Sequence, residues 1–280
     1  MKIIEAGCLE GLSLSQRAKS RIRQSRREPL FIADWDRVLM IHFAVDPKQL
    51  QGDVPFELDT RDGLAFATVV AFTMRGMRPF WGGRVTSWLF RPLATHDFLN
   101  VRTYVRAGGE VGIHFLAEWV SNRIAMALGP RIFSLPYRSG RIDYQNDWTR
   151  GVLNGRVEDA RTGASFAYRA KLGDGARFSE CEAGSLDDWL TERYSAFNSV
   201  NGCSRFFRVW HEPWLQCKAR VDMADTSLLE ANWDWFRYAE FVGANYSPVV
   251  RDVWLGWPHR VNLGDFSLSR DWRRVAEPQP

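Results

Sequence analysis

Apolar and polar residues alternate along most of the chain and give way in places to short apolar runs, a pattern typical of strands. Turn signals such as Asp62-Gly63 and Gly108-Gly109 separate these segments. Strands are predicted over residues 35–45, 57–60, 64–75, 99–106, 111–119, 132–133, 141–147, 152–159, 165–172, 204–211, 214–223 and 250–257. Because a short turn favours antiparallel pairing, we expect 57–60 to pair with 64–75, and 204–211 to pair with 214–223.

The predicted helices are few and short. Asp46 can cap one helical turn that begins at Pro47 and ends near residue 51. Ser185 and Asp188 resemble a capping box, which predicts a helix that continues to about residue 195.

A third helix is predicted over residues 122–128, with Ser121 as its N-cap. Gly129 suits the left-handed position that follows a helix. Pro130 has no backbone N–H to donate, so the helix is expected to end before it.

These elements predict an α+β fold of mostly antiparallel strands with a few short helices. No internal repeat or shift in composition divides the chain. We therefore expect one domain over residues 29–280, preceded by a basic arm over residues 1–28. Residues 76–96 are rich in glycine, proline and tryptophan and predict a long aromatic loop, which covers either a ligand site or core alone.

The hairpin over 99–106 and 111–119 predicts which side chains share a face. With a two-residue turn, Arg102 and Tyr104 lie on the same face as Ile113, Phe115, Ala117 and Trp119, and one extra residue would reverse that set. An arginine among aromatic residues is either an anion-binding group in a pocket or a residue of the outer face. Arg102, Tyr104, Phe115 and, by its location, Glu118 are the candidate ligand-binding residues.

Composition narrows the classes of function. The net charge of +4 is a mild excess of 37 basic over 33 acidic residues. The one clustered stretch, 17–27, is interpreted as a solvated, loosely ordered part of the arm, so no specific nucleic-acid partner is expected. The 13 Trp and 18 Phe predict an aromatic cavity or interface.

Cysteine spacing and apolar run length indicate the compartment. The four cysteines show no C-x-x-C spacing, no signal peptide is evident, and reduced thiols in the cytoplasm are the simplest account. The longest apolar runs are too short to span a membrane, although an interfacial association stays open.

Several motifs occur in one order: HFAVDPKQLQGDVPFELDTRDG at 42–63, FLNVRTYV at 98–105, SLDDWLTERYSAF at 185–197 and HEPW at 211–214. Together they resemble the DUF2071 or YqjF-like family of the acetoacetate decarboxylase-like superfamily, over roughly residues 34–262. The resemblance implies a large curved sheet that closes towards a cone or barrel around a ligand cavity. It implies no activity, because none is established for this branch.

The superfamily's decarboxylases carry two lysines after a Gly-Phe-Pro segment, and the first forms a Schiff base. In this chain Tyr137 and Arg138 hold those positions, and neither can form an imine. The family mechanism is therefore not expected here. Lys171 or Lys218 could supply an amine in principle, but surface positions are expected for both.

Tyr137, Arg138 and His42 are the candidate catalytic residues. A phenol at Tyr137 could act as a general acid or oxyanion donor if a nearby guanidinium stabilised its ionised form, yet adjacent strand residues point to opposite faces. His42 is either a base in the cavity or a hydrogen-bonded core residue. The remaining histidines lack metal-ligand spacing and no phosphate-binding loop occurs, so neither a metal nor another cofactor is predicted.

Three functions are consistent with the sequence. The first is a protein that binds a small organic anion or apolar metabolite in an aromatic cavity. The second is an enzyme that uses non-covalent acid–base chemistry, such as a lyase, hydratase or isomerase acting on a keto or hydroxy acid. The third is a non-catalytic interaction module whose aromatic loop and basic arm contact a partner. A homo-oligomer stays open in each case.

Overall fold

The computed structural model describes residues 11–25, 28–82, 86 and 88–261 of the 280-residue chain. Within them the strands are β1 (Phe31–Val45), β2 (Glu57–Leu58), β3 (Ala65–Pro79), β4 (His96–Ala107), β5 (Glu110–Val120), β6 (Tyr137–Asp147), β7 (Val152–Asp159), β8 (Ser165–Leu172), β9 (Ser195–Val200), β10 (Cys203–Trp210), β11 (Cys217–Asp225), β12 (Glu240–Leu255) and β13 (His259–Arg260). The α-helices are α1 (Leu14–Gln24), α2 (Pro47–Leu50), α4 (Arg123–Phe133), α5 (Leu186–Thr191) and α6 (Ser227–Glu230). Short 3-10 turns are η2 (Gln51–Asp53), η3 (Arg91–Leu93), η4 (Trp148–Arg150) and η5 (Asp234–Tyr238).

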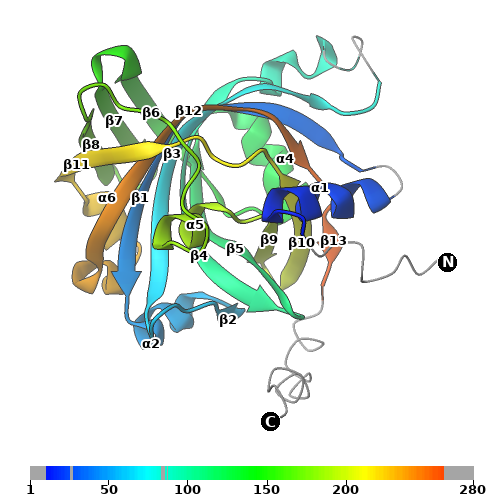
Figure 1. Ribbon diagram of the computed structural model, residues 1–280, viewed down its shortest axis with the longest axis horizontal. Coiled ribbons are helices and arrows are strands. Elements are labelled where there is room, and N and C mark those ends of the chain that lie inside the picture. Colours follow the sequence, from blue (N-terminus) through cyan, green and yellow to red (C-terminus); the bar gives the residue numbers. More distant parts are fainter. Residues whose placement is uncertain (1–10, 26–27, 83–85, 87, 262–280) are drawn as a thin grey trace.

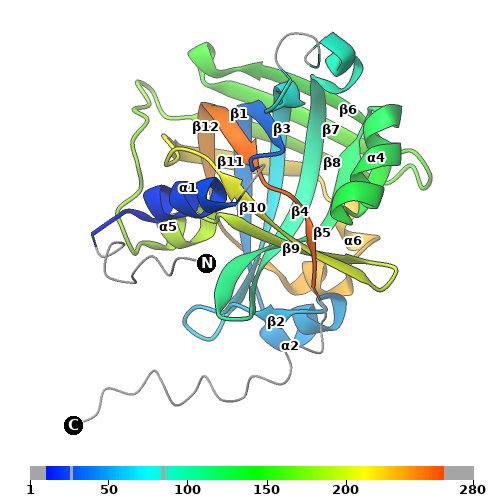
Figure 2. The same ribbon diagram turned by 90° about the vertical axis from the view of Figure 1, so that its right-hand side faces the viewer.

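These strands form one large, mostly antiparallel sheet in the order β13-β10-β9-β5-β6-β7-β8-β11-β12-β1-β3-β4-β2. Additional pairings join β10 to β12 and β5 to β4, so the sheet curls partly round an axis (Figures 1 and 2). Only the pairs β5–β6 and β5–β9 are parallel among those described. The predicted α+β class with a curved antiparallel sheet is confirmed.

The central strands are buried on both faces. In β1, Leu39, Ile41 and Phe43 belong to one hydrophobic core, whereas Met40 and Ala44 belong to another. Successive side chains of a strand point to opposite faces, so one strand can serve two cores. This arrangement explains why β1 and β3 contain continuous apolar runs rather than strict alternation.

Two predicted hairpins are wrong. The turn at Asp62-Gly63 forms, with both residues at positive φ, but β2, which precedes this turn, pairs with β4 rather than with β3. Likewise β10 pairs with β9, β12 and β13, while β11 pairs with β8 and β12. In both cases distant strands supplied pairing partners that the intervening turn could not indicate.

Helix α4 departs from its prediction at both ends. Its N-cap is Asn122, whose side chain accepts hydrogen bonds from the backbone N–H groups of Ile124 and Ala125. The helix then continues through Gly129 and Pro130 to Phe133, so residues 132–133 are helical rather than extended. Ser134, at φ 53°, takes the left-handed position that had been expected for Gly129.

Helix α1 lies within the predicted basic arm. A capping box at Ser13 and Gln16 starts it, and Ser15, Ala18 and Ile22 are buried against the sheet. The Ser15 hydroxyl donates to the carbonyl of His211 at 2.7 Å. For residues 17–24 the interpretation as loosely ordered chain is therefore wrong. Residues 1–10 and 26–27 lie outside the described part.

Other local predictions need smaller corrections. Within the predicted loop over residues 76–96, β3 continues to Pro79 and η3 forms at Arg91–Leu93. Helix α5 is capped by Ser185 as predicted, but it ends at Thr191, and β9 begins at Ser195. In the part of the chain that the structure describes, no helix is long and apolar enough to cross a membrane. Cys181, Cys203 and Cys217 are free thiols.

Candidate functional site

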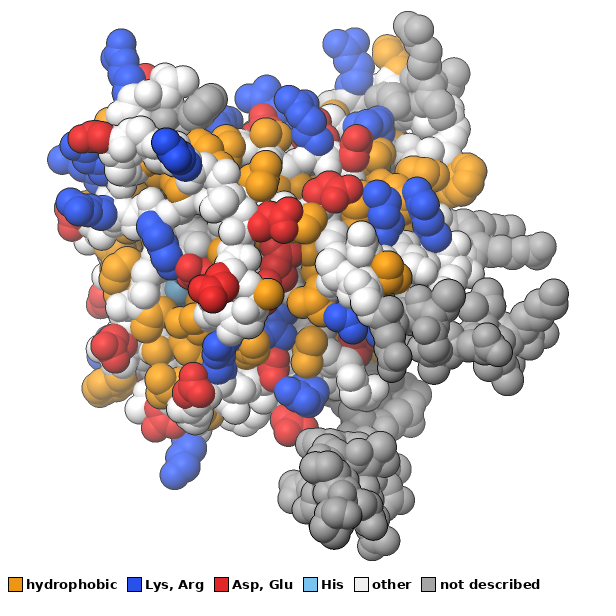
Figure 3. Space-filling view, in the orientation of Figure 1, with side chains coloured by type: hydrophobic (Ala, Val, Ile, Leu, Met, Phe, Trp, Pro, Cys, Tyr) orange, Lys and Arg blue, Asp and Glu red, His pale blue; other side chains and the backbone are white. Residues whose placement is uncertain are grey.

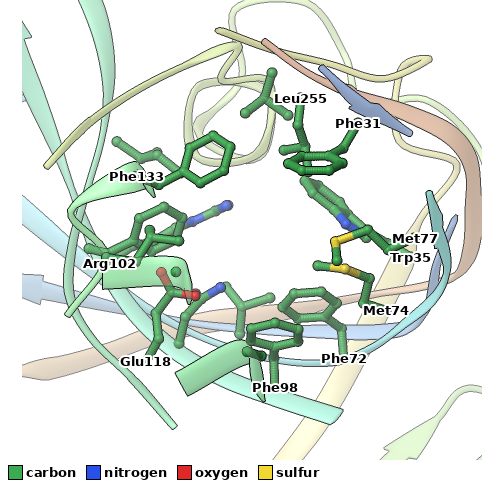
Figure 4. A pocket seen from close by; sticks show the side chains of 18 of the residues that line it. Phe31, Trp35, Phe72, Met74, Met77, Phe98, Arg102, Glu118, Phe133 and Leu255 are labelled. Carbon is green, nitrogen blue, oxygen red and sulfur yellow. The ribbon is translucent and has the colours of Figure 1, made fainter. Parts of the chain in front are cut away.

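A cavity of about 180 Å³ lies inside the curved part of the sheet, closed on one side by α4. Most of its wall is aromatic, aliphatic or methionine side chain (Figure 4). Arg102 and Glu118 point into it from one side and face Trp35, Met74 and Met77. The residues that line it are Phe31, Trp35, Val38, Met40, Val70, Phe72, Met74, Met77, Phe90, Leu93, His96, Phe98, Asn100, Arg102, Ile113, Phe115, Glu118, Ala125, Leu128, Gly129, Ile132, Phe133, Leu135, Tyr137, Arg193, Ser195, Phe207, Val209, His211, Trp214 and Leu255.

A β-bulge determines which side chains of the central hairpin enter the cavity. Arg102 pairs with Phe115, but Val101 pairs with Ala117, so Leu116 is an extra residue in β5. After Leu116 the side chains of β5 point to the opposite faces from those predicted, so Glu118 lies on the cavity side with Arg102 and Phe115. Ala117 and Trp119, which were predicted on that side, instead belong to the opposite core.

Arg102 is a buried cation without a counter-ion in the described structure. Its side chain is buried, its Nη2 donates to the carbonyl of Leu190 at 3.5 Å, and its Nε has no hydrogen-bond partner. No described carboxylate lies within ion-pair distance of it. Burial of an unpaired charge costs free energy, which an anion bound in the cavity would offset.

Arg193 lines the cavity as a second guanidinium, but it is paired. Its Nη1 lies 2.7 Å from Asp59 Oδ2, and both side chains are almost fully buried. Arg106 holds the other oxygen of Asp59, also at 2.7 Å. Since Asp59 compensates Arg193, the unpaired positive charge at this end of the cavity is that of Arg102.

Glu118 lies in an apolar environment. Burial raises the pKa of its carboxyl group to about 8, and its Oε1 has no partner among the described residues. The carboxyl is therefore mostly protonated at neutral pH and does not neutralise Arg102. Asn100, opposite Glu118 in the hairpin, also presents an unpaired Oδ1 to the cavity.

Tyr137 lines the cavity, and Arg138 does not. Tyr137 begins β6 and pairs with Glu118 in the parallel register. Burial and the neighbouring Glu118 raise the pKa of its phenol well above the ordinary value, so the hydroxyl stays protonated. On the opposite face of β6, the Arg138 guanidinium donates to Asn232 and lies 5.3 Å from the centre of the Trp119 ring. Arg138 therefore does not reach the Tyr137 hydroxyl to stabilise its ionised form.

His42 and Tyr104 form a buried hydrogen-bonded chain outside the cavity lining. Tyr104 donates its hydroxyl to the Leu190 carbonyl at 2.8 Å and lies 2.7 Å from the Thr68 hydroxyl, which lies 2.9 Å from His42 Nδ1. A carbonyl only accepts, so each group in turn donates and His42 carries its proton on Nδ1. Burial lowers the pKa of His42 to about 3.

The structure thus brings Arg102, Phe115, Glu118 and Tyr137 to one cavity and leaves His42, Tyr104 and Arg138 outside its lining. Arg193 was not predicted, because its pairing with Asp59 joins residues 134 positions apart. No lysine is among the described residues of the lining, and Lys218 pairs with Asp187 at 2.6 Å. In the described chain, no group of His, Cys, Asp and Glu side chains could hold a metal ion.

Comparison with known proteins places the chain in a family. The profile of DUF2071, described as an uncharacterized conserved protein, matches residues 32–238. The chain belongs to the DUF2071 family. The uncharacterized protein YqjF of Bacillus subtilis is 29% identical over 201 residues, which cover 71% of this chain and 79% of that protein. The matched residues of this DUF2071 chain include Arg102, Glu118 and Tyr137.

Solved structures show the fold of this DUF2071 member. An acetoacetate decarboxylase-like enzyme from Sphingomonas wittichii RW1 superposes with a TM-score of 0.54 at 17% identity, covering 84% of this chain and 94% of that one. The enduracididine biosynthesis enzyme MppR, complexed with the condensation product of pyruvate and imidazole 4-carboxaldehyde, gives 0.58 at 13% identity, with 84% and 90% covered. The DUF2071 chain therefore has the acetoacetate decarboxylase-like fold.

Gly129→Ala should disturb the cavity through Tyr137. A β-carbon at Gly129 would overlap the Tyr137 ring, so the ring or α4 must move. We expect a loss of about 1 to 3 kcal/mol in the free energy of unfolding, measured by urea denaturation. Gly52→Ala is the matched control, because a β-carbon there meets nothing within 4 Å. Equal stability of the two variants would show that the ring does not hold this position.

Stability should be greatest near pH 6.5. Burial lowers the pKa of His96, His114 and His211 to about 4, so their contribution is present above pH 6.5 and is lost as the pH falls through 4. Because the pKa of Glu118 is raised, its contribution to the free energy of unfolding is fully present below about pH 4.5 and is lost as the pH rises to about 8. Between pH 6.5 and 8 we expect a decrease of about 2 kcal/mol. In Glu118→Gln, urea denaturation should show no such decrease; an equal decrease would contradict the assignment.

Proposed function

We propose that this protein binds a small organic anion in the cavity, with the carboxylate of the ligand held by Arg102 and its apolar body packed among the aromatic and methionine side chains. The observation that carries this proposal is the buried Arg102 guanidinium that has no carboxylate partner in the described structure. A bound carboxylate would supply both a charge and an acceptor for the unpaired Nε.

The polar groups of the wall narrow the ligand class. Trp35 Nε1 is an unpaired donor, while Asn100 Oδ1 and Glu118 Oε1 lack partners. A keto or hydroxy group beside the carboxylate could satisfy some of these atoms, whereas a purely aliphatic acid could not. The related fold of MppR has been solved in complex with pyruvate, an oxo acid, which agrees with this class of ligand.

Isothermal titration calorimetry tests the proposal by comparing the affinity of the protein for acids with its affinity for their primary amides. Pyruvate and phenylpyruvate would be compared with pyruvamide and phenylpyruvamide, which keep the shape and remove the charge. We expect at least one acid to bind at least about tenfold more tightly than its amide. Affinity should also fall above pH 8, where Glu118 ionises, and Glu118→Gln should remove that decrease. Equal affinity of acid and amide would exclude the anion site.

A second candidate is a non-covalent acid–base enzyme acting on a keto or hydroxy acid. The specific observation in its favour is the adjacency of a protonated carboxyl at Glu118 and a protonated phenol at Tyr137, both lining the cavity that contains Arg102. Glu118 could donate a proton to a substrate oxygen while Arg102 holds the carboxylate.

Turnover and binding separate the two candidates. If the protein is an enzyme, Tyr137→Phe should abolish the conversion of a bound acid while the acid still binds. Nuclear magnetic resonance of the reaction mixture measures conversion, and titration calorimetry measures binding. If the wild-type protein binds the acid but leaves it unchanged, the result favours the binding function over the enzyme. Since no lysine is among the described residues of the cavity lining, borohydride treatment with pyruvate should give no covalent adduct in a mass spectrum.

A further inference from the structure

The rim of the cavity carries exposed apolar side chains from two neighbouring segments. Trp88 and Leu89 follow β3 and are 65% and 62% exposed, and Ile124 of α4 is 47% exposed. A hydrogen bond of 2.7 Å from Asn122 Nδ2 to the carbonyl of Pro92 ties the two segments together. We call this set, with Leu128 of α4, the rim patch.

The rim patch is continuous with the cavity wall. Phe90 follows directly after Leu89, Leu93 comes three residues later, and both line the cavity. Leu128 lines the cavity and is also 38% exposed. The exposed apolar side chains of the patch therefore adjoin residues of the cavity wall, and Leu128 belongs to both.

Three exposed arginines lie next to the rim patch along the chain. Arg78 of the same segment pairs with Asp252 at 3.4 Å. Arg91, Arg123 and Arg131 are exposed, and none of them forms an ion pair with another described residue. Over the face of the molecule that Figure 3 shows, acidic and basic side chains are instead interspersed. A surface that combines exposed Trp and Leu with arginines that have no described ion-pair partner is complementary to an anionic lipid surface.

We propose that the rim patch docks the mouth of the cavity onto an anionic lipid bilayer. Trp88, Leu89 and Ile124 enter the interface between headgroups and acyl chains, and the arginines contact the lipid phosphates. A carboxylate with an apolar body then exchanges between the bilayer and the cavity without crossing water. This last step rests on the proposed anion-binding function, whereas the docking does not.

Flotation of the full chain with vesicles tests the docking. Vesicles of phosphatidylcholine alone would be compared with vesicles that also contain about one third phosphatidylglycerol. We expect binding to the anionic vesicles only, with an affinity that falls as salt is added. The double variants Trp88→Ala/Leu89→Ala and Arg91→Glu/Arg123→Glu should each reduce binding at least about tenfold.

Matched variants elsewhere control for general effects. Tyr238 is 75% exposed in η5, and the side chain of Arg150 is 84% exposed in the turn between β6 and β7. Tyr238→Ala and Arg150→Glu should bind anionic vesicles like the wild type. No binding at low salt, equal binding to both vesicle types, or equal loss in the control variants would overturn the docking. A change in oligomeric state caused by Trp88→Ala/Leu89→Ala would also overturn it, by assigning the patch to another copy of the chain.

Failure of the docking and failure of the proposed function give different results. Trp88, Leu89, Arg91 and Arg123 do not line the cavity, so the rim variants should still bind soluble acids in the titration. Vesicle binding without acid binding would support the docking on lipid and exclude the anion site. Acid binding without vesicle binding would do the reverse.

Discussion

Arg102→Met should weaken the binding of any carboxylate ligand at least about 100-fold, because it removes the unpaired charge of the cavity while roughly keeping the volume of the side chain. The same change should leave the free energy of unfolding equal or higher, since a buried cation without a counter-ion is replaced by an apolar group at a position that lies beside Met40. Titration with an acid and urea denaturation measure the two effects.

Arg106→Met is the matched control for this prediction. Arg106 also carries a guanidinium on β4, but its side chain is 44% exposed, pairs with Asp59 and does not line the cavity. It should bind acids like the wild type. Undiminished binding in Arg102→Met would show that the ligand's charge lies elsewhere.

Asp59→Ala should cost about 3 to 5 kcal/mol in the free energy of unfolding, the largest loss of stability that we expect from one substitution. It leaves the guanidinium of Arg193 buried beside the cavity without its partner at 2.7 Å. Arg106→Ala breaks the second ion pair of Asp59 at a partly exposed position and should cost only about 1 kcal/mol or less. Urea denaturation compares the two variants, and a similar loss in both would refute a special role for the buried pair.

The sequence predicted much of the fold because local patterns determine it. The strands of the central hairpin, the cap at Asp46 and the helix start at Ser185 all depend on neighbouring residues, and each is confirmed. Pairing between distant strands was not predictable in this way. The partners of β2, β10 and β11 are chosen by packing across the whole sheet.

The candidate site was predictable in part for the same reason. The alternation in β4 and β5 placed Arg102 and Phe115 on one face, as the structure has them. The extra residue Leu116 has no signature in the pattern, yet it turns Glu118 into the cavity and Trp119 out of it. The position of Gly129 inside a helix was also not predictable from neighbouring residues. A glycine is required there because the ring of Tyr137, from β6, leaves no room for a β-carbon.

The pairing of β1 with β12 has a consequence for how the chain is made. Partners such as Leu39 and Tyr246 are about 200 residues apart, so β1 keeps an unpaired edge until β12 has left the ribosome. Contacts this remote slow folding, and the wall of the cavity cannot be completed before Leu255 arrives. A nascent chain that lacks β12 would expose a long apolar strand, which makes the period before β12 is synthesised the one in which aggregation is most favoured.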